Sequence, residues 1–252
     1  MKISVVIITK NEAHIIANTL QSLKAVTDDM VIVDSGSTDD TVKIAKQFNA
    51  AVIETGWTGY GMTKNKGNAA AKNDWILSLD ADEAVDSALK ESLGKLNMEN
   101  ENVVYRLNRK NFFCGKHIRF GEWGTNKIIR VFNRNKTKWN TDLVHEQLVL
   151  ADEVIIKPLK GSLLHYTAYD QKSYEAKTIE YARLSAKKYF AKGEKAGVLK
   201  KYFSPVFSFV QNYIFRLGFL DGPEGFIIAK NTARYTFLKY SYLKEMNKNS
   251  SA

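Results

Sequence analysis

Apolar runs alternate with polar segments in a repeating order over the first third of the chain. Runs with the length of strands, rich in Val, Ile and Leu, lie at 3–8, 30–33, 51–53 and 75–79. Such runs are typical of parallel strands that are covered on both faces. Between them, apolar residues recur at helical spacing within 15–23 and 42–48. Strands that alternate with helices predict βαβ units, and therefore an α/β fold.

The last third of the chain has a different pattern. From about Lys172 onward, apolar residues fall on one side of a helix, and a cluster of lysines follows. The uncharged, aromatic-rich run Tyr202–Phe215 comes next, and it is shorter than the roughly 18–20 residues that a membrane span needs. We therefore expect two domains: residues 1–165 form the α/β domain, and residues 166–252 form a helical C-terminal appendage.

Composition and charge narrow the class of protein. A chain of 252 residues with 44% hydrophobic residues can bury a sizeable core, and its net charge of +10 points to an anionic partner. The single cysteine, Cys114, cannot form an intramolecular disulfide. The apolar run Val5–Ile8 is too short for the core of a signal peptide. We expect the protein to stay in the cytoplasm.

The stretch Trp75–Glu83 carries the strongest sign of chemistry. Its strand-like run ends in Asp80-Ala81-Asp82, and residues two apart in an extended or tightly turning backbone point to the same side. Both carboxylates therefore face the region just beyond the C-terminal end of the strand, where open α/β sheets bind their ligands. Two carboxylates so close repel each other unless a cation lies between them, and Mg²⁺ or Mn²⁺ suits such oxygen ligands. A solvated acidic turn is the alternative for this pattern taken alone.

Polar residues also follow the first two predicted strands. Asp34 ends the second strand, where doubly wound folds place an acidic group that recognises a nucleoside. A capping or turn aspartate fits the same position. Thr9, Asn11 and Glu12 could likewise have either a binding or a structural role. Neither a Gly-x-Gly-x-x-Gly motif nor a Gly-rich Walker loop follows the first strand, which argues against a dinucleotide site and a P-loop.

Glycines punctuate a predicted loop at 56–67, between the third and fourth strands, and this loop holds Lys64. Glycine lets a backbone approach a ligand closely, and a lysine supplies a point charge for phosphate. The loop is therefore a candidate phosphate-binding segment.

These segments resemble, in the same order, the motifs of family 2 glycosyltransferases, which have the GT-A fold. The matching segments are Ser4–Glu12, Val33–Asp39, Lys64–Gly67 and Leu79–Asp82. The resemblance implies a Rossmann-like, mostly parallel sheet flanked by helices. It also implies a nucleotide-sugar donor, with a UDP-sugar expected, and Mg²⁺ or Mn²⁺ as cofactor.

The same resemblance assigns roles to individual residues. The donor-binding set is Thr9, Asn11, Glu12, Asp34, Lys64 and Asp80. Within it, Thr9, Glu12 and Asp34 lie near the base and ribose, and Asp80 lies near the ribose. Asp82 is expected on the metal. Many relatives carry Arg where Lys64 stands, so a point charge replaces a bidentate phosphate contact.

The second half of the chain extends the likeness to lipopolysaccharide-core glycosyltransferases of the WaaE type. The resembling segments are Phe120–Trp123, Lys127–Phe132, Val144–Glu146 and Tyr213–Phe226. The likeness implies that the acceptor is a lipid-linked saccharide, such as the lipopolysaccharide core, at the cytoplasmic face of the inner membrane.

An inverting transfer needs a stabilised leaving group and a base that deprotonates the acceptor hydroxyl. Glu122 and Glu146 are the candidates for the base, because each adjoins an aromatic residue or a histidine inside a polar stretch. His145 could ligate the metal through a neutral nitrogen, or it could orient a loop. Each of these three residues could instead be structural.

Basic and aromatic residues in the C-terminal region predict peripheral contact with an anionic membrane. The lysine cluster that precedes the aromatic run consists of Lys187, Lys188, Lys192, Lys195, Lys200 and Lys201. An ordinary packed helical cap with a solvated lysine face is the alternative.

Two other functions fit parts of the sequence. A nucleotidyltransferase normally has a Gly-rich phosphate loop where Thr9–Glu12 stands here. A non-enzymatic binder of membranes or RNA would explain the charge, but it would leave Asp80 and Asp82 without a task. We favour the glycosyltransferase and expect no nucleic-acid partner.

Overall fold

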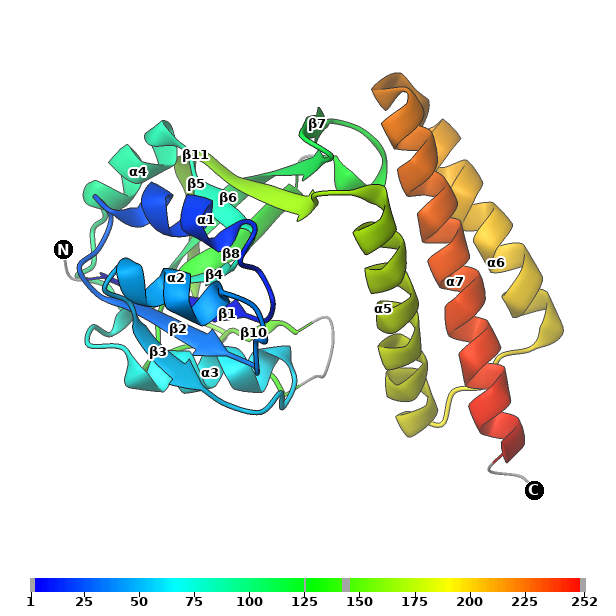
Figure 1. The fold of residues 1–252 in the computed structure, drawn as a ribbon, viewed down its shortest axis with the longest axis horizontal. Coiled ribbons are helices and arrows are strands. Elements are labelled where there is room, and N and C mark those ends of the chain that lie inside the picture. Colours follow the sequence, from blue (N-terminus) through cyan, green and yellow to red (C-terminus); the bar gives the residue numbers. More distant parts are fainter. Residues whose placement is uncertain (1–2, 125, 142–145, 250–252) are drawn as a thin grey trace. The chain divides into compact units, whose positions relative to one another are not determined.

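The computed structural model describes residues 3–124, 126–141 and 146–249 (Figure 1). The chain divides into two compact units. The first comprises residues 1–109 and 126–165, and the second comprises residues 110–125 and 166–252. Strands β6 (Val103–Phe113) and β11 (Ile155–Ala168) pass from one unit into the other. The functional division at residue 165 stays a prediction.

A single large sheet is the centre of the first unit. Over the described residues its strands follow the order β3-β2-β1-β4-β8-β6-β11-β5. The further bounds are β1 (Ile3–Thr9), β2 (Met30–Asp34), β3 (Ala51–Glu54), β4 (Trp75–Asp80), β5 (Glu83–Val85) and β8 (Asn126–Asn133). Strands β3, β2, β1 and β4 are parallel, whereas β8 is antiparallel to both β4 and β6. The sheet is therefore parallel from β3 to β4, and beyond β4 the pairs β4–β8, β8–β6 and β11–β5 are antiparallel.

Helices cover both faces of the parallel strands. The helices of the first unit are α1 (Ile16–Leu23), α2 (Thr41–Gln47), α3 (Tyr60–Ala70) and α4 (Ser87–Gly94). Strand β1 is buried along its whole length because its side chains alternate between two apolar cores. Ile3, Val5 and Ile7 share one core with buried residues of α1, α2 and α4, and Val6 lies in the other core, on the α3 side. The predicted α/β fold class is confirmed.

Helix α3 corrects one prediction, because the segment at 56–67 is a loop only in its first part and is helical from Tyr60. Its glycines allow close packing within the protein. A Cβ atom at Gly61 would lie 1.8 Å from the backbone oxygen of Asn140. At Gly67 it would lie 2.3 Å from a methyl group of Val6 and 2.8 Å from one of Val33. Gly67 therefore lets α3 pack closely onto strands β1 and β2, and Gly61 lets it pack against the backbone of Asn140.

The second unit is mainly helical, as the sequence predicted. Its long helices are α5 (Gln171–Ala191), α6 (Val198–Val210) and α7 (Pro223–Asn249), and α7 packs against both of the others. Ala186, Tyr240 and Leu243 form a small core between α5 and α7. Within the described residues, none of the helices has both the length and the apolar character to cross a membrane.

Residues 110–124 form the rest of the second unit that the structure describes. Strand β7 (Lys116–Ile118) and the short helix η1 (Gly121–Trp123) lie here. The buried carboxylate of Asp221, at the end of helix η3 (Gly218–Asp221), accepts hydrogen bonds from the amides of Arg119 at 3.1 Å and Phe120 at 2.8 Å. These bonds attach the segment that carries Glu122 to the C-terminal helices.

The packing of α3 gives a stability prediction. Gly67→Ala forces a methyl group into the side chains of two sheet residues, so we expect a loss of about 1–3 kcal/mol in the free energy of unfolding. Gly56→Ala is the matched control, since a Cβ atom there has no neighbour within 4 Å. Denaturant unfolding measures both variants. Equal stability of Gly67→Ala and Gly56→Ala would contradict this packing.

Candidate active site

The carboxyl ends of β1, β2 and β4 lie side by side. Thr9 pairs with Asp34 across β1 and β2, and Ile8 pairs with Asp80 across β1 and β4. Because parallel strands end at the same edge, the predicted residues Thr9, Asp34 and Asp80 come together there. This edge is the candidate active site.

The polar loops after β1 and β2 bind to each other. Asn11 donates its amide to the Ser37 hydroxyl at 2.8 Å, and its side-chain oxygen accepts from the Thr38 amide at 2.7 Å. The Glu12 amide donates to the Thr41 hydroxyl at 2.8 Å. These bonds hold the predicted donor-binding residues Asn11 and Glu12 at the sheet edge.

Asp34 is buried and organises the turn that follows β2. Its carboxylate accepts the amides of Gly36 at 3.0 Å and Ser37 at 2.8 Å, and it also accepts the Ser37 hydroxyl. Asp34 therefore acts as a turn aspartate in the structure, which was one of the two roles that the sequence allowed. A contact with a nucleoside stays a prediction for this residue.

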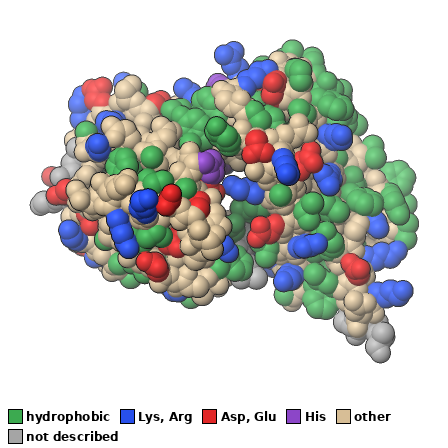
Figure 2. Space-filling view, in the orientation of Figure 1, with side chains coloured by type: hydrophobic (Ala, Val, Ile, Leu, Met, Phe, Trp, Pro, Cys, Tyr) green, Lys and Arg blue, Asp and Glu red, His purple; other side chains and the backbone are tan. Residues whose placement is uncertain are grey.

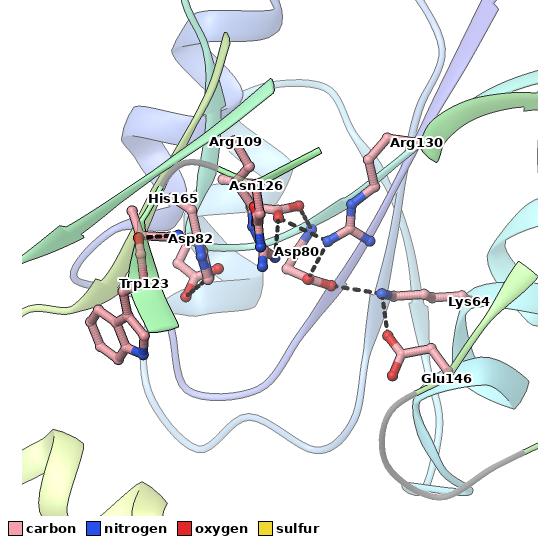
Figure 3. Close-up of polar contacts among 11 residues, drawn as sticks. Lys64, Asp80, Asp82, Arg109, Trp123, Asn126, Arg130, Glu146 and His165 are labelled. Carbon is pink, nitrogen blue, oxygen red and sulfur yellow. Dashed lines mark hydrogen bonds and ion pairs between the residues drawn. The ribbon is translucent and has the colours of Figure 1, made fainter. Parts of the chain in front are cut away.

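Asp80 lies between two cations (Figure 3). Its carboxylate is 3.0 Å from Lys64 Nζ and accepts a hydrogen bond from Arg130 Nη2 at 2.9 Å. Burial alone would raise the pKa of Asp80. The charges of Lys64, Arg130 and His165 more than offset burial, and they hold this pKa well below its usual range. Asp80 is therefore a firmly ionised, charge-compensated carboxylate.

Glu83 follows Asp80 by three residues and is 0% exposed. It accepts from Arg130 Nη2 at 2.8 Å and from the backbone amide of Asp80 at 3.0 Å, and Arg109 Nη1 is 3.7 Å away. Arg109 is in turn held by Asn126, to which its Nε donates at 3.1 Å. The buried Glu83 thus supports both the backbone at Asp80 and the arginine that contacts the Asp80 side chain.

Asp82 points toward His165 on β11 (Figure 3). The Asp82 carboxylate and His165 Nε2 are 3.5 Å apart, and His165 pairs with Glu83 across β11 and β5. Burial lowers the pKa of His165, but the negative charge of Asp82 outweighs burial and raises this pKa above its usual value. His165 was not among the residues predicted from the sequence.

Lys64 is 1% exposed and is surrounded by charged and aromatic groups. Besides Asp80, it contacts Glu146 Oε1 at 2.6 Å, and its ammonium group lies 4.6 Å from the centre of the Trp139 ring. The structure thus brings the predicted residues Lys64, Asp80 and Glu146 together. Lys64 lies on helix α3 and not on a loop.

The remaining two candidates from the sequence are Glu122 and His145. Glu122 is an exposed residue of the second unit, in η1. His145 lies outside the described residues.

The residues fit a magnesium or manganese ion in part. Asp80 and Asp82 offer the carboxylate oxygens that these ions prefer. Among the described residues, no group of three or more His, Cys, Asp or Glu side chains is arranged to hold a metal. Such an ion would therefore need further ligands, and Mg²⁺ in phosphate-transferring sites takes them from waters and substrate phosphates.

The sheet and its acidic carboxyl edge place the chain in the class of α/β proteins with a candidate site at the strand ends. Comparison with known proteins shows the family to which the chain belongs. The model of the family described as "Glycosyl transferase family 2" matches residues 4–154, so the chain belongs to this family. This confirms the resemblance of its motifs.

Two relatives and one solved structure are similar over most of the chain. An uncharacterized glycosyltransferase of Rickettsia typhi is 29% identical, over 98% of this chain and 88% of the relative. The lipopolysaccharide core biosynthesis glycosyltransferase LpsC of Rhizobium meliloti is 29% identical, over 94% of this chain and 90% of the relative. S. aureus TarS 1–349 is 16% identical, with a TM-score of 0.47, over 99% of this chain and 92% of that one.

The depressed pKa of Asp80 makes a pH-dependent contribution to stability. A carboxylate whose pKa is lower in the folded state stabilises the protein above its unfolded-state pKa of about 4, and this contribution is lost as the pH falls below that value. Asp80→Asn should therefore be less stable than the wild type at pH 7, by about 2 kcal/mol, and the difference should narrow toward pH 2. Denaturant unfolding across pH measures this.

Asp40→Asn is the matched control, because the exposed Asp40 carboxylate pairs with the exposed Lys43 at 3.7 Å, and such pairs contribute little to stability. A wild-type and an Asp80→Asn curve that run parallel from pH 7 to pH 2 would contradict the assignment.

Proposed function

We propose that this family 2 enzyme is an inverting glycosyltransferase. It moves a sugar from a nucleoside-diphosphate donor, a UDP-sugar, to a hydroxyl group of a lipid-linked saccharide such as the lipopolysaccharide core. The observation that carries the proposal is the pair Asp80 and Asp82 at the carboxyl edge of the parallel strands, in a chain whose residues 4–154 match the family. The 29% identity with LpsC over 94% of this chain supports the class of acceptor.

The donor's nucleoside is proposed to bind between the loops after β1 and β2. Thr9, Asn11, Glu12 and Asp34 line these loops, and the hydrogen bonds between them fix their backbone before a ligand arrives. A pre-formed site costs less ordering entropy on binding. Asp80, on the neighbouring strand end, is then within reach of the ribose, as the family motif implies.

Asp82 is proposed to hold Mg²⁺ or Mn²⁺, with Asp80 beside it. When bound, such an ion supplies positive charge that neutralises the leaving diphosphate. His165 lies next to Asp82 and restricts the orientation of its carboxylate. Lys64 and Arg130 add two fixed positive charges at the same edge. These residues give the site the positive charge that a diphosphate leaving group requires.

The base that deprotonates the acceptor hydroxyl is Glu146 or Glu122. Glu146 belongs to the ion network of Asp80 through Lys64, whereas Glu122 is carried by the segment that Asp221 holds. In a turnover assay, the Gln variant of the true base loses transfer while it still binds the donor.

A surface on α6 is proposed to contact the cytoplasmic face of the inner membrane. Hydrophobic side chains gather on the surface over this helix (Figure 2). The most exposed of them are Leu199 at 72%, Phe203 at 69% and Phe207 at 64%, and their spacing places them along one stripe of the helix. Lys200, Lys201 and the end of α5 supply the neighbouring positive charges. An apolar stripe beside lysines is the pattern of an interfacial helix.

Catalysis tests the first half of the proposal. Asp82→Asn keeps the shape of the side chain but loses its charge, so transfer and metal-dependent hydrolysis of a UDP-sugar panel should fall by at least about 100-fold. Asp74→Asn is the control, because Asp74 precedes β4 at the amino end of that strand and pairs there with Arg134 at 3.0 Å. Circular dichroism checks the fold of both variants. Undiminished hydrolysis by folded Asp82→Asn would refute the assignment.

Vesicle binding tests the second half. Replacing Leu199, Phe203 and Phe207 by Ser should abolish co-sedimentation with anionic vesicles. Replacing Lys187, Lys188, Lys200 and Lys201 by Gln should weaken it, since each lysine contributes about 1 kcal/mol that salt screens.

The matched control replaces Val149, Ile155 and Ile156 by Ser, because these three residues are also exposed but belong to the first unit. If both Ser triples pellet like the wild type, or if the wild type pellets equally with neutral vesicles, α6 is an ordinary packed helix.

A further inference from the structure

Two buried cations bind the carboxylate that a metal ion would approach. Lys64 and Arg130 are 1% and 5% exposed, and they lie 3.0 Å and 2.9 Å from the Asp80 carboxylate. In a buried environment charges are weakly screened, so both keep a strong influence on any ion nearby. Asp80 is therefore already neutralised before any ligand binds.

This arrangement opposes the binding of a metal ion alone. A divalent cation at Asp80 has to replace one or both cations and then remain close to them. Like charges in a weakly screened site repel strongly. The same two cations attract a diphosphate, since lysine and arginine both bind phosphate oxygens.

We propose that Lys64 and Arg130 couple the two binding events, so that the site takes up a metal ion appreciably only together with a diphosphate. This inference rests on the proposed function. The coupling is reciprocal by thermodynamic necessity, so metal and diphosphate each raise the affinity for the other by the same factor.

The surroundings allow the cations to leave Asp80 without becoming unpaired. Lys64 stays bound to Glu146 at 2.6 Å, and Arg130 stays bound to Glu83 at 2.8 Å. The Trp139 ring adds a cation–π contact to each, at 4.6 Å from Lys64 Nζ and 5.9 Å from the Arg130 guanidinium. A buried charge that lost its only partner would be costly, but these two keep a second one. Asp80 can therefore exchange its partners for a ligand.

Calorimetry with Mn²⁺ alone, with UDP alone, and with Mn²⁺ at saturating UDP tests the inference. In the wild type, UDP should tighten Mn²⁺ binding by a factor within about 5–150. Part of this factor reflects direct contact between metal and phosphate, so the decisive comparison is with Lys64→Met. In that variant Mn²⁺ alone should bind about 10-fold more tightly than in the wild type, and UDP alone more weakly.

Lys66→Met is the matched control. It removes the same charge from the same helix, but residues two apart do not face each other, and Lys66 Nζ binds Thr55 at 2.7 Å instead. Its Mn²⁺ affinity should equal that of the wild type. Arg130→Gln is the second variant, on a different strand, and it should also tighten Mn²⁺ binding. Arg130→Gln tests the coupling if Lys64→Met does not fold.

The outcomes separate the two proposals. Mn²⁺ binding that is unchanged or weaker in folded Lys64→Met or Arg130→Gln overturns the coupling. A folded wild type that binds no UDP, with or without Mn²⁺, instead contradicts the proposed donor. Tighter Mn²⁺ binding in both cation variants, with Lys66→Met unchanged, supports the coupling.

Discussion

The buried carboxylate of Glu83 is the constraint on which the candidate site depends. A fully buried charge is tolerated only when it is paired, and Glu83 is paired with Arg130 and lies near Arg109. Through its second oxygen it also holds the amide of Asp80. The buried ion pair of Glu83 and Arg130 therefore fixes the turn that carries Asp80 and Asp82. The chemistry that we propose for the sheet edge relies on that rigidity.

The change of strand direction beyond β4 supplies these partners. The parallel half of the sheet brings the polar strand ends of β1, β2 and β4 to one edge. The antiparallel half then brings Arg130 on β8 to Asp80 and Glu83, and it brings Arg109 on β6 near Glu83. One half of the sheet thus supplies the acidic edge, and the other half supplies the arginines that neutralise it.

The fold class and the acidic edge could be predicted because their signals are local. Apolar runs in strands and the Asp80-Ala81-Asp82 turn are visible in a few consecutive residues. Arg130 and His165 were missed, because a single charged residue inside a strand acquires its partner only through long-range pairing. The apolar pairs Ile128-Ile129 and Val131-Phe132 on either side of Arg130 were the available signal, since they place its charge next to the buried half of β8. Part of helix α3 was predicted as a loop because of its glycines. In the structure, Gly61 and Gly67 instead allow close packing against residues that are distant in sequence.

We expect the carboxyl edge at Asp80 and Asp82 to bind a metal ion together with a nucleoside diphosphate. Anomalous diffraction from crystals grown with Mn²⁺ and UDP tests it most directly. One strong manganese peak should lie about 2.1 Å from an oxygen of Asp82, with the diphosphate as a further ligand. Bound UDP with no manganese at Asp82, or manganese at a site away from this edge, would contradict it.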